Sequence, residues 1–285
     1  MNSSLHPKRF TIMALIAASM YVIGASSNTK YENPLISVVY YAFISPVYVH
    51  WRYLVSEQLS ELRPIVTSKY LTDVHAVFAS ENVSLLSEAA SVAKFKLPTV
   101  NIHEIHENLF EYPGIHLVWE LANKNRSRDV DYFLYFHSKG MVNSNFNSHK
   151  IMRTGYNVAL TAAVILQWEL VLHLFSTRSD VKKVGYISSC KGFVWFNFFW
   201  VRGSYIIGLV EPQKPTNKHP NLEGRFYYEH WLGKLLNKEK TPADRQWNDT
   251  ISLAPTFDMN HTLTSCNFMK LLNDPNIRRH IFKVV

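Results

Sequence analysis

The chain has 285 residues, of which 47% are hydrophobic and only 18% are charged, and this composition excludes a disordered or fibrous protein. The length suits one large α/β domain, or one domain together with a membrane segment. The formal net charge of +8 indicates an anionic partner such as a phosphate group, a nucleotide sugar or a membrane surface. Nucleic acid is not expected as a partner, because the basic residues are scattered and no recognised binding module occurs.

The first element in chain order is an N-terminal apolar run. Basic residues within positions 6–9 precede the run, which extends from Phe10 to Gly24 and is at the short end for a membrane span. The basic residues would stay in the cytosol. We therefore expect residues 1–30 to form a cytosolic tail and signal anchor, and residues 31–285 to form a single lumenal domain. A cleaved signal peptide is the alternative, and both interpretations predict the secretory pathway.

The next elements alternate between strand and helix. Segments rich in β-branched and aromatic residues predict four strands: residues 35–45, 73–80, 99–105 and 131–137. Helices are predicted between them, where apolar residues recur at helical spacing: residues 51–62, 83–93 and 113–123. This alternation is typical of a Rossmann-like α/β fold, in which a mostly parallel sheet is flanked by helices.

The second half of the chain has a different texture. Residues 156–175 are almost uninterruptedly apolar, but Glu169 and His173 would be costly in lipid. We expect a helix buried beneath the sheet there, with a transmembrane helix as the alternative. Further strands are predicted over residues 183–189 and 192–201, and a helix over residues 226–233. The tail beyond residue 241 gives little periodic signal.

Polar residues lie at or just after the ends of three of the predicted strands: Ser45, Ser80, Glu81, His137, Ser138 and Lys139. Right-handed crossovers align the carboxyl ends of parallel strands along one edge, which is where open α/β sheets bind ligands. A cation, a hydroxyl and an imidazole at that edge are suited to a phosphorylated ligand. An ordinary polar turn after each strand is the alternative interpretation.

Two further groups of residues carry candidate chemistry. Asn197 and Trp200 lie in an aromatic run, and aromatic faces stack on sugar rings while an amide hydrogen-bonds to hydroxyls. Tyr228 precedes Glu229, and a carboxylate in an aromatic pocket can serve as a general base. The alternatives are aromatic residues that fill the core and a glutamate that is solvated on a helix.

Several other motifs indicate less. In residues 103–107 the second histidine stands at i+3 rather than at the i+4 of a metalloprotease helix, which leaves a two-histidine, two-carboxylate metal cluster as a minor alternative. Asp129-Val-Asp131 resembles a metal-binding Asp-X-Asp, yet it precedes its strand and so lies at the wrong edge of the sheet. Cys190 and Cys266 are the only cysteines, and one disulfide between them is compatible with an oxidising lumen.

Possible glycan acceptors agree with a secretory protein. The sequence holds four tripeptides of the acceptor type, beginning at Asn82, Asn125, Asn248 and Asn260. Such tripeptides are frequent by chance, so they are compatible with a glycoprotein and do not establish one.

Five short motifs, taken together and in order, carry a resemblance to a known family: Tyr112–Gly114, Trp119–Ala122, Leu134–Met141, Asn197–Trp200 and Tyr228–Trp231. Over roughly residues 35–236 the chain resembles a glycosyltransferase family that has a nucleotide-diphospho-sugar transferase (GT-A-like) fold and a His-Ser-Lys-Gly motif. In that fold the strand that here ends in His137 usually ends in an Asp-X-Asp, which binds a divalent metal and the donor diphosphate. That motif is absent at this position.

The resemblance implies roles for particular residues. It implies donor-binding residues on the first, second and fourth strand ends: Ser45, Glu81, His137, Ser138 and Lys139. It implies acceptor-binding residues in the second half: Asn197, Trp200 and Tyr228. Glu229 would be the catalytic base, and Lys139 would also be catalytic because its charge neutralises the diphosphate leaving group without metal. Alternatively, His137 ligates Mn²⁺ or another divalent cation together with a carboxylate from elsewhere.

The sequence therefore predicts a glycosyltransferase that moves a sugar from a nucleotide-sugar donor to a glycan or glycoconjugate acceptor. We expect a single-pass type II protein of the Golgi or endoplasmic reticulum membrane, with its domain in the lumen. A non-catalytic carbohydrate-binding or structural protein of the same fold is the alternative, because the Asp-X-Asp is missing. A multi-span membrane protein is a third option, and it rests on residues 156–175 alone.

Overall fold

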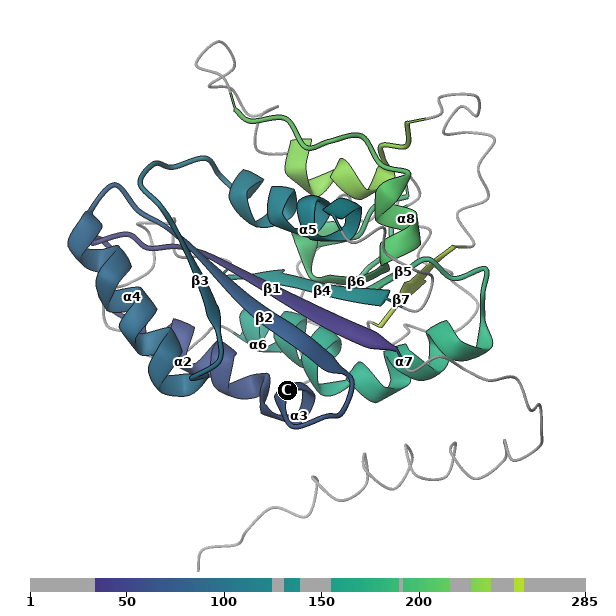
Figure 1. The fold of residues 1–285 in the computed structure, drawn as a ribbon, viewed down its shortest axis with the longest axis horizontal. Helices are drawn as coiled ribbons and strands as arrows, with labels where there is room; N and C mark the ends of the chain where they lie inside the picture. Colours follow the sequence, from purple (N-terminus) through teal and green to yellow (C-terminus); the bar gives the residue numbers. More distant parts are fainter. Residues whose placement is uncertain are drawn as a thin grey trace, which may run out of the picture. The chain divides into compact units, whose positions relative to one another are not determined.

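The structure is a computed structural model that describes residues 34–124, 131–138, 155–189, 192–215, 227–236 and 249–253. These residues form one seven-stranded sheet of order β3-β2-β1-β4-β6-β5-β7, flanked by helices (Figure 1). The predicted N-terminal anchor, Lys139 and both cysteines lie outside the described residues.

Four parallel strands form one half of the sheet: β1 (Leu35–Phe43), β2 (Leu71–Ala79), β3 (Asn101–Ile105) and β4 (Asp131–His137). All four predicted strands are confirmed, with boundaries shifted by a few residues. β1 and β4 pair with each other and are central in the sheet, so both of their faces are covered. This burial explains why their sequences are almost continuously apolar.

The other half of the sheet is mixed. β6 (Phe199–Arg202) runs antiparallel to both β4 and β5 (Lys183–Gly185), and β7 (Thr250–Ser252) is parallel to β5. The strand predicted over residues 192–201 is confirmed only in its last part, because Trp195–Asn197 forms the 3₁₀ turn η2 instead. The sheet is therefore mostly parallel, with one antiparallel strand.

Helices cover both faces of the sheet (Figure 1). One face carries the larger group: α2 (Trp51–Glu61), α3 (Arg63–Val66), α4 (Val83–Lys96), α6 (Gly155–Thr161), the π-helical turn η1 (Ala162–Leu166) and α7 (Trp168–Thr177). The other face carries α5 (Tyr112–Lys124), α8 (Gly203–Ile207) and the 3₁₀ turn η3 (Trp231–Gly233). The helices predicted over residues 51–62, 83–93 and 113–123 are all present.

The two faces of the sheet hold two separate hydrophobic cores. Side chains alternate along a strand, so Val38 and Tyr40 of β1 join the core beneath α2 and α4, whereas Val39 and Tyr41 join the core beneath α5. The apolar face predicted for α2 is likewise confirmed, since Trp51, Leu54, Val55, Leu59 and Leu62 are all buried.

The long apolar segment of the second half is a broken helix. The parts Asn157–Leu166 and Trp168–Thr177 meet at an angle of 51°. Leu160, Val164 and Val171 are fully buried in the core, as expected of a helix beneath the sheet. Among the described residues, no single helix is long and apolar enough to cross a membrane, and this bent pair meets those criteria only when its two parts are taken together.

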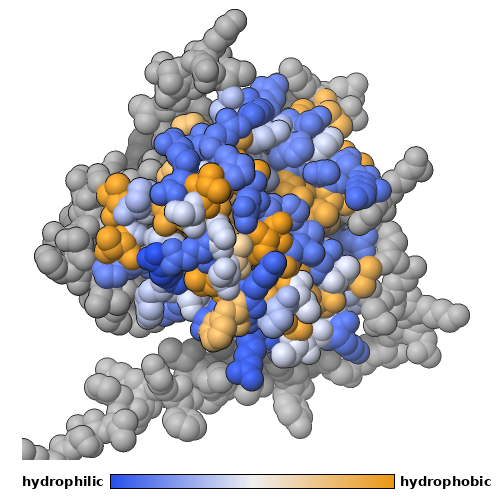
Figure 2. Space-filling model, turned by 60° about the vertical axis from the view of Figure 1, so that its left-hand side comes forward, coloured by the Kyte–Doolittle hydropathy of each residue, from blue (hydrophilic) through white to orange (hydrophobic). Residues whose placement is uncertain are grey.

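The surface drawn in Figure 2 mixes hydrophobic and hydrophilic residues. Among the residues that the structure describes, the most exposed large apolar side chains are Phe95 of α4 and Val47 of the loop after β1. Isolated apolar residues of this kind are normal on protein surfaces.

Candidate functional site

The sheet changes direction between β1 and β4. After β1 the chain adds β2 and β3 on one side, and then returns to add β4 on the other side. The carboxyl ends of β1 and β4 therefore meet at a topological switch point, where open α/β sheets bind their ligands. His137 ends β4 opposite Tyr41 of β1. The N–H of Ser138 donates to the carbonyl of Tyr41 at 2.9 Å, which fixes the backbone at this point.

The described part of the predicted polar rim lies at the ends of β1, β2 and β4, and Lys139 is outside it. The N–H of Ile44 donates to the carbonyl of Ala79 at 2.7 Å, so Ser45 lies at the same edge of the sheet as Ser80 and Glu81. Ser45 Oγ accepts a local hydrogen bond from the N–H of Val47 at 3.3 Å. Glu81 is exposed. Their proposed contacts with a donor stay predictions.

Three side chains from three different segments meet at the switch point. His137 Nε2 lies 2.9 Å from the carbonyl oxygen of Phe196 and 3.6 Å from Glu111 Oε1. Asn197 Nδ2 donates to Glu111 Oε2 at 2.5 Å. We call Glu111, His137 and Asn197 the switch-point cluster. It joins a residue predicted for the donor side, His137, to one predicted for the acceptor side, Asn197.

The carboxylate is the most accessible part of the switch-point cluster. The side chain of Glu111 is 18% exposed, against 9% for His137, and Asn197 is 1% exposed. Sequence reasoning missed Glu111, because it belongs to no motif and lies in the loop after β3. The signal that could have found it is its position, since an acidic residue between a parallel strand and the next helix lies at the ligand-binding edge of the sheet.

Backbone strain is concentrated around this cluster. Among the described residues, the non-glycine residues with positive φ are Phe110 (53°), Phe196 (71°) and Asn197 (54°). Asparagine tolerates this left-handed region, but a bulky phenylalanine is a real outlier there. Phe110 immediately precedes Glu111, and the other two supply the carbonyl and the amide that bind His137 and Glu111. Such strain persists where the surrounding structure enforces it, and it clusters at functional sites.

Two buried tyrosines lie close to the cluster. Burial and the nearby Glu111 carboxylate raise the pKa of the Tyr41 and Tyr135 hydroxyls well above the usual value, so both stay protonated. Neither hydroxyl has a hydrogen-bond partner within the part of the chain that the structure describes. The absence of a side chain at Gly114 lets α5 approach them, since a Cβ there would lie 2.8 Å from Tyr41 Cβ and 2.9 Å from Tyr135 Cε2.

The position of Trp200 corrects one expectation. Its side chain is fully buried in the core on the α2 face, and its indole N–H donates to the carbonyl of Val164 at 2.7 Å. A residue with no exposed surface does not stack on an acceptor sugar, so the predicted role of Trp200 does not fit. Asn197 lies instead in the turn before β6, where its amide binds Glu111.

Tyr228 and Glu229 lie on the α5 face of the sheet. Tyr228 is buried in that core, and its hydroxyl donates to the carbonyl of Gln213 at 2.8 Å. Glu229 is 7% exposed. The ring of the next residue, His230, lies 4.5 Å from that of Phe193, so this segment lies beside the loop that leads to Asn197. The predicted roles of Tyr228 and Glu229 stay predictions.

At the switch point, one nitrogen of His137 is already engaged. His137 Nε2 lies 2.9 Å from the carbonyl oxygen of Phe196, a contact in which this nitrogen carries the proton, so Nδ1 is the nitrogen with a lone pair for a metal. Among the described residues, no three His, Cys, Asp or Glu side chains are grouped so that they could hold an ion. His103 belongs to the segment of the minor metal alternative. Its Nε2 lies at hydrogen-bonding distance, 3.0 Å, from Nδ1 of His75 on the neighbouring strand β2.

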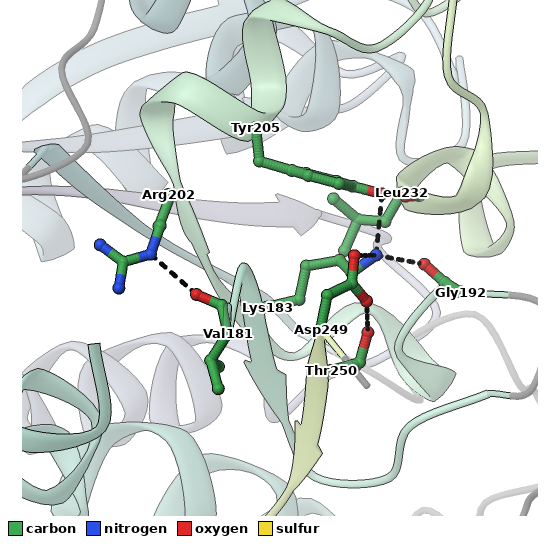
Figure 3. A network of polar contacts seen from close by, with 8 residues as sticks. All are labelled: Val181, Lys183, Gly192, Arg202, Tyr205, Leu232, Asp249 and Thr250. Carbon is green, nitrogen blue, oxygen red and sulfur yellow. Dashed lines mark hydrogen bonds and ion pairs between the residues drawn. The ribbon is translucent and has the colours of Figure 1, made fainter. Parts of the chain in front are cut away.

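A second polar network surrounds Lys183 of β5, next to the edge strand β7 (Figure 3). The ammonium of Lys183 is fully buried and binds the carbonyl of Gly192 at 2.9 Å, the hydroxyl of Tyr205 at 2.8 Å and the carboxylate of Asp249 at 3.2 Å. Tyr205 in turn donates to the carbonyl of Leu232 at 2.8 Å. The three donors of the ammonium are thereby matched by three acceptors, so this network ties segments together and is not an open site.

Comparisons with known proteins give a distant structural likeness. No protein-family model matches the chain, and no curated protein sequence matches it. Among solved structures, 4-diphosphocytidyl-2C-methyl-D-erythritol synthase is similar over 61% of this chain and 78% of that chain, with a TM-score of 0.33 and 10% sequence identity. A likeness of this degree does not indicate a function.

Proposed function

We propose that the chain is a glycosyltransferase that moves a sugar from a nucleotide-sugar donor to a glycan or glycoconjugate acceptor. The observation that carries the proposal is the switch-point cluster, which places a carboxylate, an imidazole and an amide from separate segments at the ligand-binding edge of the sheet. The strained backbone on both sides of the cluster supports a functional role, because such strain clusters at functional sites.

The donor is proposed to lie along the rim formed by β1, β2 and β4. Ser138 stands at the end of β4, and Lys139 follows it as a cation for the diphosphate leaving group. A divalent cation such as Mn²⁺ at the donor site is also proposed, on the basis of the sequence alone. The proposed location is the lumen of the secretory pathway, with residues 1–30 as the membrane anchor.

A donor screen tests the proposal. The purified chain is incubated with UDP-glucose, UDP-galactose, UDP-N-acetylglucosamine or GDP-mannose, together with a set of p-nitrophenyl glycosides, and the released nucleoside diphosphate is measured. We expect release that depends on the acceptor and collapses in Lys139→Ala. The control is Lys94→Ala, which changes an exposed lysine of α4 and should leave the rate unchanged. Turnover that Lys139→Ala does not alter would remove Lys139 from the mechanism.

Binding measurements separate the enzyme from its alternative. Calorimetry with the same nucleotide sugars, with and without Mn²⁺, should show binding of at least one donor. Binding of a glycoside without donor binding, and without transfer, would favour a non-catalytic carbohydrate-binding protein of the same fold.

A further inference from the structure

We infer that Glu111 accepts the proton of the acceptor hydroxyl during transfer, which is the role that the resemblance gives to Glu229. The inference rests on the proposed function and assigns its catalytic base. Its first support is position, because Glu111 is hydrogen-bonded to Asn197 and lies 3.6 Å from His137 at the end of β4. It therefore stands between the segment proposed to hold the donor and the segment proposed to face the acceptor.

The second support is the accessibility and orientation of the Glu111 carboxylate. Glu111 has the largest exposed fraction in the switch-point cluster, so it is the member of the cluster that is most accessible to an incoming hydroxyl. Asn197 is almost fully buried, and its amide is directed to Glu111 Oε2, so it orients the carboxylate. The imidazole of His137 is fixed by the contact of its Nε2 with the carbonyl oxygen of Phe196. Asn197 and His137 are thus positioning residues, and the carboxylate is the reacting group.

The third support is the rigid attachment of Glu111. Its carbonyl accepts the N–H of Ile115 at 3.1 Å, so Glu111 lies at the start of the 13-residue helix α5. The preceding residue, Phe110, has a positive φ, and its N–H is bound by Asn108 Oδ1 at 3.1 Å. The positive end of the helix dipole favours the ionised carboxylate, which is the form that a base requires.

The proposed transfer is a single displacement at the anomeric carbon of the donor. The O–H bond of the acceptor breaks and its proton passes to a carboxylate oxygen of Glu111, while the acceptor oxygen forms a bond to the anomeric carbon of the donor. The bond between that carbon and the diphosphate oxygen breaks, and the diphosphate leaves with the electron pair. The displacement inverts the anomeric centre and needs no further reactant.

Matched glutamine variants test the inference with the donor and the p-nitrophenyl glycoside that the wild-type chain uses best. Glu111→Gln should lower kcat by about 100-fold or more, the usual contribution of a general base, while calorimetry shows unchanged donor binding. Glu229→Gln should keep most of the activity. Glu107→Gln changes a 54%-exposed partner of Lys214 in the same loop and serves as the control.

Chemical rescue distinguishes a base from a structural residue. In Glu111→Gly, added formate should restore part of the transfer rate, because it supplies the missing carboxylate. Loss of activity in Glu111→Gln without rescue in a folded Glu111→Gly would assign a structural role and overturn the inference, as would full activity in Glu111→Gln. A wild-type chain that neither binds nor uses any of the nucleotide sugars would instead overturn the proposed function itself.

Discussion

Asn197 shows how one residue combines strain with positioning. Its φ of 54° lies in the left-handed region, which a glycine adopts freely but an alanine does not. Asn197→Gly and Asn197→Ala both remove the hydrogen bond to Glu111, so the two variants differ only in backbone freedom. We expect the alanine variant to be less stable than the glycine variant by about 1 kcal/mol in urea unfolding. Equal stability of the two would contradict the strained geometry.

His103 predicts a pH dependence of stability. Burial and the neighbouring His75 lower the pKa of His103, although Glu120 acts in the opposite direction. The folded state therefore resists protonation of His103, whereas the unfolded chain takes up the proton near a pH of about 6.5. The contribution of His103 to stability should be present above that pH and be lost as the pH falls below it, until the lowered pKa is reached.

The measurement for His103 is urea unfolding at several pH values, compared between wild type and His103→Gln. The difference between the two free energies of unfolding isolates this side chain, because the other titrating groups largely cancel. We expect the variant to lose less stability than the wild type on acidification. A difference that does not change with pH would contradict the prediction.

At the scale of the element, the contact of α5 with the sheet depends on Gly114. A Cβ at this position would lie 2.8 Å from Tyr41 Cβ and 2.9 Å from Tyr135 Cε2, so Gly114→Ala must displace the helix. We expect a loss of about 1–3 kcal/mol in the free energy of unfolding, together with reduced transfer activity, since Glu111 stands at the start of α5. The control is Gly208→Ala, where the nearest atom to a new Cβ is 3.4 Å away, and its stability should be unchanged or slightly raised.

The elements also show what the sequence could and could not predict. β1 and β4 were predictable, because they are central parallel strands that are buried on both faces and read as continuous apolar runs. The predicted start of the strand over residues 192–201 was wrong. The positive φ of Phe196, which interrupts the extended backbone, cannot be recognised from an aromatic sequence. The break in the long apolar helix was also hidden, because the carbonyl of Val164 is bound by an indole 36 residues away, that of Trp200.

The candidate site was only partly predictable from the sequence. His137 and Asn197 were found as polar residues among apolar ones, but the contact that joins them runs through Glu111. That contact depends on how the loop after β3 returns to the sheet edge, which is a property of topology and not of local pattern. Trp200 was misassigned because an aromatic run does not tell which side chains face the core.

At the scale of the whole molecule, Lys183 holds together segments that are distant in sequence. Its partner Asp249 adjoins β7, and the carbonyl of Asp249 also accepts the N–H groups of Lys182 and Lys183. Asp249→Ala would leave a buried ammonium without its carboxylate, and we expect a loss on the order of 2 kcal/mol in the free energy of unfolding.

A double-mutant cycle checks the origin of that loss. Lys183→Met together with Asp249→Ala should be less destabilised than the sum of the single variants, because no buried charge is left without a partner. Asp180→Ala removes the partner of Arg178 in an exposed ion pair and should leave stability unchanged. Additive losses for Lys183 and Asp249 would show that the ion pair is not what couples them.

The antiparallel strand β6 separates β4 from β5, and within the described part of the chain β5 pairs with β6 and β7 alone. During synthesis the ribosome therefore releases β5 before any strand exists that can pair with it. Until Phe199–Arg202 emerges, one edge of β4 has no neighbouring strand, and its backbone is open to pairing with other nascent chains. Chains stalled before β6 should accordingly depend on chaperones, whereas those that have passed it should not.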